Sequence, residues 1–334
     1  MSEVPTVDIA ALFAADPDER EAGDRAVAAA VAEAGCFVVS GYPDAAEIDR
    51  RAAVLLAFFD LPAEEKAAVA TRVTNPEGKR IYRGYVASLK PGDWAHNEMF
   101  DIGPDEPRPG PSIPGGEILA ERNNWPAREP VAGWQATMRA YYAHLREVAL
   151  AVMLAAGRSA GFAEADLRQR FDGGNSTLRL LNYPVPPPGS RVIDELPDLR
   201  AGAGTPRLAA GRHTDGSGVS LLWQGQPGLQ AQGPDGRWRD IPQAPNGLSV
   251  HLGDVLEIMT DGAVPATPHR VLDHGVARQS AGFFLEPALG AHLTPVAKQL
   301  SEAERHSAKG TYAWHLLRRI SGYEGYETLV PRPE

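Results

Sequence analysis

The tripeptide His213-Thr214-Asp215 marks the point where this sequence changes from helical patterns to a series of short strands. The runs after it are typical of strands and are separated by Pro-Asp-Gly, Pro-Asn-Gly and Asp-Gly turn signals. They span residues 219–224, 228–232, 238–241, 248–252, 267–272 and 279–285. Such a series suits a double-sheet jelly roll, which can enclose a cavity for a small ligand.

Helical patterns dominate the chain before this point. They predict helices over 24–34, 45–59, 132–160 and 163–171, a short helix at 61–64, and strands within 4–12, 35–39 and 176–183. Two Gly- and Pro-rich stretches without periodicity predict loops: 71–116, with short extended pieces bordering a pocket, and 184–210, whose role as a lid is left open. A last helix is expected over 302–320.

The expected fold class is therefore mainly β with flanking helices around a double-stranded β-helix, or jelly-roll, core. We expect one compact unit with two regions. Residues 1–120 form an N-terminal scaffold of helices and strands, and residues 121–334 form the jelly-roll region with a long backing helix and a C-terminal helix.

Composition limits the possible partners. The 334 residues are 43% hydrophobic, enough for a large core, and the net charge of −10 disfavours nucleic acid, which requires basic surfaces. The single cysteine, Cys36, cannot form an internal disulfide and is expected to be a small buried side chain. The acidic start does not resemble a signal peptide, and no apolar run is long enough to span a membrane. These features predict a cytoplasmic protein that binds neither nucleic acid nor membranes.

His213 and Asp215 are two residues apart, so on an extended segment their side chains point to the same side and can bind one metal ion. A second histidine comes later, in Pro268-His269-Arg270. Two histidines and one carboxylate leave three adjacent positions open, as in non-haem Fe(II) oxygenases, although zinc hydrolases use the same ligand types. Arg278 favours iron, because a guanidinium can grip the distal carboxylate of an organic cosubstrate, and Ser280 shares its strand parity.

These residues resemble the isopenicillin N synthase-like family of Fe(II)- and 2-oxoglutarate-dependent dioxygenases, which includes plant flavonoid and gibberellin oxygenases and the bacterial ethylene-forming enzyme. The resemblance runs almost end to end, through Pro5-Thr6-Val7-Asp8, Gly35-Cys36-Phe37-Val38-Val39, Phe58-Phe59-Asp60-Leu61-Pro62, Glu98-Met99-Phe100-Asp101, Asn124-Trp125-Pro126 and Gly253-Asp254. It implies that His213, Asp215 and His269 bind iron. It also implies that Arg278 and Ser280 hold the far carboxylate of 2-oxoglutarate, with Tyr183 and Arg179 as further cosubstrate contacts.

The resemblance also suggests a substrate site and a reaction. Positions that often line the family's pocket are occupied here by Arg83, Tyr85, Phe100, Trp223 and Phe284. Two arginines, Arg83 and Arg179, suggest an anionic or amino-acid-like small molecule. The implied reaction consumes O2 and 2-oxoglutarate and releases succinate and CO2. Hydroxylation in secondary metabolism is the default outcome, while desaturation, cyclisation and epoxidation remain open.

Several alternatives remain at this point. An iron oxidase of the isopenicillin N synthase type would take all its electrons from the substrate. Ethylene formation is disfavoured, because Gly216 and Ser280 stand where the ethylene-forming enzyme has an aromatic residue and phenylalanine. A non-catalytic metal-binding jelly roll that acts as a sensor is an alternative of a different class. The expected assembly is a monomer or a weak homo-oligomer.

Overall fold

The computed structural model describes residues 3–89, 96–185, 187, 193–194 and 207–334. Its large sheet has the order β1 (Thr6–Asp8), β2 (Cys36–Ser40), β11 (Leu248–Leu252), β8 (Val219–Gln224), β13 (Arg278–Leu285), β5 (Thr177–Tyr183), β4 (Asn97–Ile102), β3 (Gly84–Ser88). Its small sheet has the order β10 (Trp238–Asp240), β9 (Leu229–Gln232), β12 (His269–Leu272), β7 (Arg207–His213), β6 (Ile193–Asp194). Pairing is antiparallel except between β1 and β2, which confirms the predicted jelly-roll core.

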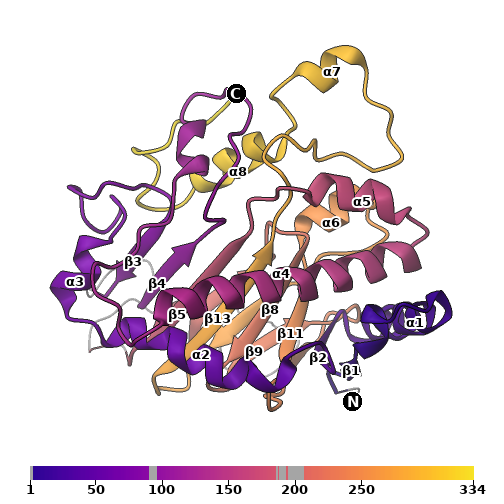
Figure 1. Ribbon diagram of the computed structural model, residues 1–334, viewed down its shortest axis with the longest axis horizontal. Coiled ribbons are helices and arrows are strands. Elements are labelled where there is room, and N and C mark those ends of the chain that lie inside the picture. The colour runs from indigo at the N-terminus through magenta and orange to yellow at the C-terminus, as the bar shows by residue number, and fades with distance from the viewer. Residues whose placement is uncertain (1–2, 90–95, 186, 188–192, 195–206) are drawn as a thin grey trace.

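Helices cover the large sheet on the side away from the small sheet (Figure 1). The long helix α4 (Trp134–Ser159) crosses this face and packs on β8 and β13, with α1 (Pro17–Ala34) and α2 (Ile48–Leu56) beside it. The apolar spacing predicted this burial, since Met138, Leu145 and Val148 are fully buried. Shorter helices are α3 (Ala63–Ala68) and α5 (Glu164–Phe171), and 3-10 turns occur at Ala10–Phe13, Ala45–Glu47, Ala57–Asp60 and Gly116–Ala120.

One apolar cluster joins both regions of the chain. The ring of Phe58 stacks on Phe100 with centroids 4.2 Å apart and on Trp134 at 5.9 Å, and the same cluster includes Phe283 of β13. The boundary near residue 120 stays a prediction. Among the described residues, no helix has both the length and the apolar character needed to cross a bilayer.

Two of the short extended pieces expected within the loops over 71–116 are strands of the large sheet. Strands β3 and β4 extend the large sheet, with Tyr85 paired opposite Phe100. The strand pattern of β4 is hidden in the sequence because polar residues lie on both of its faces. Glu98 is satisfied on the helix side by Lys66, whereas Asp101 is satisfied on the opposite side by Arg179.

The C-terminal half departs from the sequence prediction in three places. Residues 207–210, expected in a loop, belong to β7, while 186, 188–192 and 195–206 lie outside the described residues. The helix expected over 302–320 is two helices, α7 (Glu302–His306) and α8 (Tyr312–Ile320), separated at Gly310, whose φ is 85°. A short helix, α6 (Asp254–Met259), follows β11 and was not predicted.

Candidate active site

The two predicted histidines lie directly opposite each other on neighbouring strands. His213 ends β7, His269 begins β12, and the two residues are register partners. Asp215 follows β7. Its Oδ1 lies 3.8 Å from Nε2 of His213, and its Oδ2 lies 3.7 Å from Nε2 of His269. One ligand atom from each residue lies within 4.8 Å of the others, so the structure brings the predicted triad together.

Backbone contacts orient both imidazoles. Nδ1 of His213 donates to the carbonyl of Gly211 over 2.7 Å, and Nδ1 of His269 donates to the carbonyl of Thr267 over 3.1 Å. A carbonyl oxygen can only accept, so each Nδ1 carries a proton, and Nε2, on the side of Asp215, is the ring atom left to bind a metal ion. This second contact is typical of metal-binding histidines.

Asp215 supplies the anionic donor of the triad. Its Oδ2 is buried and has no hydrogen-bond partner among the described residues. Burial acts to raise the pKa of Asp215, but the adjacent His269 and His213 together lower it to about 2, so the group is a carboxylate at neutral pH. A buried carboxylate with one unpartnered oxygen, beside the Nε2 atoms of two histidines, fits a divalent transition metal ion.

A cavity of about 480 Å³ opens beside the triad, between the two sheets. Alternate residues of three neighbouring strands line one wall: Asn97, Met99 and Asp101 of β4, Thr177, Arg179, Leu181 and Tyr183 of β5, and Arg278, Ser280 and Phe284 of β13. The small sheet contributes Ala209, Leu229 and Val271 to the other wall. Residues in and after α8 close one end, namely Leu316, Arg319, Ile320, Tyr323 and Tyr326.

Arg278 and Ser280 lie at the end of the cavity away from α8. The guanidinium of Arg278 is buried, and its Nη1 donates to Oγ of Ser280 over 3.2 Å. Its Nε and Nη2 have no hydrogen-bond partner among the described residues. The ring of Tyr183 lies beside it, with its centre 5.7 Å from Cζ. A buried cation with two unused N–H donors on one edge is suited to binding a carboxylate.

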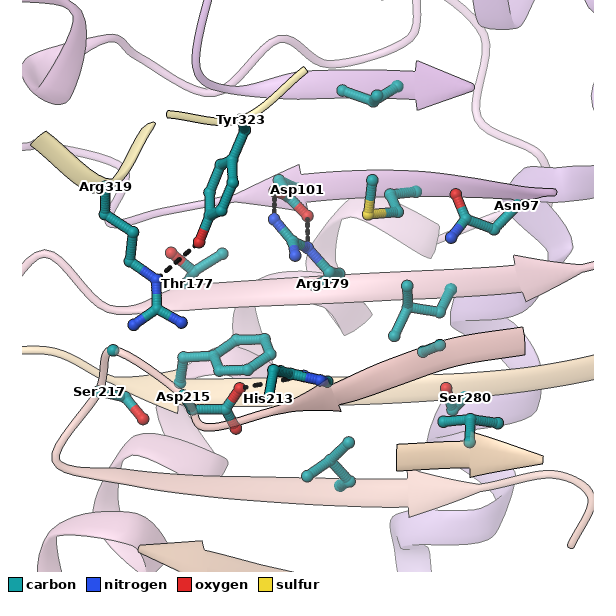
Figure 2. A pocket seen from close by; sticks show the side chains of 18 of the residues that line it. Asn97, Asp101, Thr177, Arg179, His213, Asp215, Ser217, Ser280, Arg319 and Tyr323 are labelled. Atoms are coloured by element: carbon teal, nitrogen blue, oxygen red, sulfur yellow. Dashed lines mark hydrogen bonds and ion pairs between the residues drawn. The ribbon is translucent and has the colours of Figure 1, made fainter. Parts of the chain in front are cut away.

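Two arginines elsewhere in the cavity lining already have hydrogen-bond partners (Figure 2). Nε and Nη2 of Arg179 donate to the two carboxylate oxygens of Asp101 over 2.8 and 2.7 Å. Nε of Arg319 donates to the hydroxyl of Tyr323 over 2.6 Å. Figure 2 shows the Asp101–Arg179 pair across from His213 and Asp215, with Arg319 and Tyr323 toward the α8 end and Ser280 and Asn97 toward the other end.

Four predicted substrate contacts are not among the described residues that line this cavity. Tyr85 and Phe100 point to the helix side of the sheet and pack on Phe58. Nε1 of Trp223 donates to Asp49 on α2, and Arg83 is buried against Thr177 and the carbonyl of Asn175. The family resemblance pointed to strands that line the cavity but not to the sheet face on which each side chain lies, because successive side chains of a strand point to opposite faces. Of the predicted substrate residues, only Phe284 lines the cavity in the part of the chain that the structure describes.

Several residues of the site were not predicted from the sequence. Asn97 and Asp101 lie in a stretch interpreted as a loop, although their spacing with Met99 fits one face of a strand. Arg319 of α8 and Tyr323, which follows this helix, reach the cavity from a segment that carried no recognisable signal. His251 of β11, fully buried, has its ring centre 4.5 Å from that of His269. Burial and the neighbouring His269 lower the pKa of His251 well below its usual value, so it is neutral.

Comparison with known proteins agrees with this geometry. The family model of the 2OG-Fe(II) oxygenase superfamily matches residues 176–287, and the N-terminal model of the non-haem dioxygenase in morphine synthesis matches residues 4–128. A 2-oxoglutarate-Fe(II) type oxidoreductase from Aspergillus fumigatus is 30% identical over 258 residues, covering 75% of this chain and 72% of that protein. Isopenicillin N synthase from Streptomyces clavuligerus is 28% identical over 328 residues, which cover 96% of this chain and 96% of that protein.

Comparison of the fold with solved structures also indicates an oxygenase of this superfamily. The structure of a 2OG-Fe(II) oxygenase family protein from Caulobacter crescentus superposes with a TM-score of 0.70 at 25% identity, covering 97% of this chain and 100% of that chain. The chain belongs to the 2OG-Fe(II) oxygenase superfamily. The predicted class, an Fe(II)- and 2-oxoglutarate-dependent oxidoreductase, and its cofactors are thereby confirmed at the level of the family.

Proposed function

We propose that this protein is a dioxygenase that uses Fe(II) and 2-oxoglutarate to oxidise a small molecule, with hydroxylation as its default reaction and secondary metabolism as its setting. One observation carries the proposal. Within the described part of the chain, polar atoms without a partner lie at two places in one cavity, Oδ2 of Asp215 in the histidine triad and Nε with Nη2 of Arg278. The first calls for a cation and the second for an anion, which are the two ligands that the family uses.

Each residue has a distinct role in this proposal. His213, Asp215 and His269 hold Fe(II) and leave an edge open toward the cavity, while Arg278 and Ser280 bind the distal carboxylate of 2-oxoglutarate beside Tyr183. When bound, the iron supplies O2 activation coupled to oxidative decarboxylation of 2-oxoglutarate, with release of succinate and CO2. The protein orients the two organic molecules and keeps water out, which the apolar side chains of Leu181, Leu222 and Val271 favour.

In this proposal the substrate occupies the end of the cavity nearest α8, away from Arg278. An anionic or amino-acid-like substrate was expected from two arginines, but Arg83 lies outside the cavity lining and Arg179 is neutralised by Asp101. The wall at this end instead presents aromatic groups, including Phe284 and Tyr326, together with the buried carboxyl of Glu286. We therefore propose a small substrate with an apolar or aromatic body and hydrogen-bonding groups, because most charges at this end are already paired.

A metabolite screen scored by succinate release tests the proposal. The enzyme is loaded anaerobically with Fe(II), supplied with 2-oxoglutarate and O2, and assayed with each metabolite. We expect His269→Ala to abolish succinate release while the circular dichroism spectrum stays unchanged, and His274→Ala, which alters an exposed histidine, to remain active.

Other results would contradict the proposal. Substrate oxidation that consumes O2 without succinate would point to an oxidase of the isopenicillin N synthase type. Metal binding without O2 uptake under any condition would support a non-catalytic sensor. Full activity in His269→Ala would remove the assignment of the triad.

A further inference from the structure

Asn97 of β4 lies in the same row of the large sheet as Tyr183 and Arg278. Glu98 pairs with Asn182 in the antiparallel register of β4 and β5, which places Asn97 opposite Tyr183. Tyr183 in turn pairs with Arg278 across β5 and β13. All three side chains line the cavity, and Figure 2 shows Asn97 and Ser280 at the end away from Arg319. Asn97 is therefore on the cosubstrate side of the triad.

The side-chain carbonyl of Asn97 is buried without a partner in the part of the chain that the structure describes. The residue is 5% exposed, and its Oδ1 accepts no hydrogen bond from these residues. Polar neighbours on the same strand are satisfied: Glu98 accepts from Lys66 and Asn182, and Asp101 accepts from Arg179. Buried amide groups are nearly always hydrogen-bonded, so an amide that lines a cavity and has an unpaired oxygen is available to a ligand, through this oxygen or, after rotation of the amide, through its N–H group.

Asn97 and Arg278 face the same cavity from β4 and β13, on either side of Tyr183 in β5. Nε and Nη2 of Arg278 also have no partner among the described residues, so one row of the sheet carries three such polar atoms on residues that line the cavity. A carboxylate offers two oxygens with several lone pairs, more than the free edge of one guanidinium uses. Rotation about the last side-chain bond of Asn97 can direct its N–H group toward such an oxygen, since the two ends of the amide have similar shape.

We propose that Asn97 is a third protein contact of the distal carboxylate of 2-oxoglutarate, alongside Arg278 and Ser280. This inference rests on the proposed function. It assigns part of the cosubstrate site to the N-terminal scaffold region, because β4 comes from residues before the jelly-roll strands. The contact is made only to the distal carboxylate, so it contributes to the choice of a five-carbon diacid over keto acids that lack this group.

Binding to the anaerobic Fe(II) enzyme tests the inference, with the charge-transfer absorption of the bound keto acid as readout. Two ligands are compared, 2-oxoglutarate and 2-oxopentanoate, which has the same carbon chain with a methyl group in place of the distal carboxylate. We expect Asn97→Ala to weaken 2-oxoglutarate binding about tenfold and Asn97→Asp more strongly, since a second carboxylate repels the ligand. Neither change should alter binding of 2-oxopentanoate by more than about twofold.

Control variants separate this role from a general effect on the sheet. Asn182→Ala removes a neighbouring asparagine whose amide bonds Glu98 on the helix side, and its ratio of the two affinities should equal that of the wild type. The ratio is internal to each preparation, so partial unfolding does not change it. Asn97→Ser serves as a smaller polar replacement if the alanine variant is unstable.

Two outcomes overturn the inference: an unchanged ratio in Asn97→Ala and Asn97→Ser, or an equal loss for both keto acids. If Arg278→Ala still lowers the affinity for 2-oxoglutarate relative to 2-oxopentanoate, only the role of Asn97 fails. If Arg278→Ala also leaves the ratio unchanged, the cosubstrate site of the proposed function fails with it.

Discussion

Nη2 of Arg319 donates to the carbonyl oxygen of Thr214 over 2.7 Å, and Thr214 is the residue between the triad members His213 and Asp215. The same guanidinium donates from Nη1 to Asp254 over 3.1 Å and from Nε to Tyr323. A single side chain of α8 therefore connects the C-terminal helix, the turn that carries two candidate metal ligands, and the start of α6. We therefore expect metal affinity to depend on Arg319, a residue that is not itself a candidate ligand.

Replacing Arg319 should loosen the metal site. Arg319→Met keeps much of the side-chain volume but removes the donor to Thr214, so the turn after β7 loses a constraint. We expect Mn(II), a redox-stable substitute for Fe(II), to bind about tenfold more weakly by titration calorimetry. Arg318→Met is the matched control, since Arg318 bonds the carbonyl of Pro333 away from the triad. Equal Mn(II) affinity in wild type and Arg319→Met would contradict this role.

Gly216 should also affect metal affinity, because it lies against the guanidinium of Arg319. A Cβ atom at Gly216 would lie 2.4 Å from Nη1 of Arg319, so Gly216→Ala must displace the guanidinium from its position near Thr214. We expect Gly216→Ala to lower Mn(II) affinity to an extent similar to Arg319→Met. The double variant should be no worse than either single variant, because both remove the same contact. Additive losses in this cycle would show that the two residues act independently.

Arg278→Ala should raise the apparent KM for 2-oxoglutarate far more than the apparent KM for iron. Removing a buried guanidinium from a carboxylate partner typically costs about 2–5 kcal/mol, which corresponds to a loss of roughly 30-fold or more. Steady-state assays of succinate release at varied concentrations of each ligand measure both values. Arg278→Lys should recover only part of the loss, since an ammonium group lacks the paired donors. An unchanged KM for 2-oxoglutarate would exclude Arg278 as its anchor.

A stability prediction concerns the helix side of β4. Nζ of Lys66 donates to Glu98 over 2.6 Å, and both side chains are largely buried. Burial alone would raise the pKa of Glu98, but hydrogen bonds from Lys66, Tyr85 and Asn182 lower it below its ordinary value of 4.5. Lys66→Met leaves this buried carboxylate short of a partner, so we expect a loss of about 3 kcal/mol in the free energy of unfolding at pH 7.

The pH dependence of this loss follows from the sign of the shift. Since the folded pKa of Glu98 is depressed, its contribution to stability is present above about pH 4.5 and is lost as the pH falls through the folded pKa. The difference between wild type and Lys66→Met should therefore shrink in urea unfolding below about pH 4.5. Arg128→Met, which breaks a more exposed pair with Glu65, should cost less than about 1 kcal/mol at either pH. A pH-independent difference would contradict the assignment to Glu98.

The sequence predicted the strands after His213 and the triad well, because both depend on local patterns. Alternation and turn signals define β8 to β13, and the spacing of His213 and Asp215 places both side chains on one side of an extended segment. Resemblance then identified Arg278 and Ser280, which the structure places together in the cavity. Strand β4 was missed because Glu98 and Asp101 give it polar groups on both faces, each satisfied by a residue distant in sequence.

The substrate end of the cavity could not be predicted for a different reason. It is assembled from α8, β5 and β13, whose mutual placement depends on packing over the whole fold. The positions of Tyr85 and Phe100 show the difficulty, since each differs by only one residue from a neighbour that does line the cavity, Val86 or Met99. Strand parity, rather than residue type, decides which of them a substrate can contact.

The alternating faces of β4, β5 and β13 have a consequence for laboratory evolution of this protein. Substitution libraries at Val86, Met99, Leu181 and Phe284 would reshape the cavity while leaving the helix-covered core intact. Insertion or deletion of a single codon within these strands would instead exchange the two faces, so altered substrate preference should come from point changes at constant strand length.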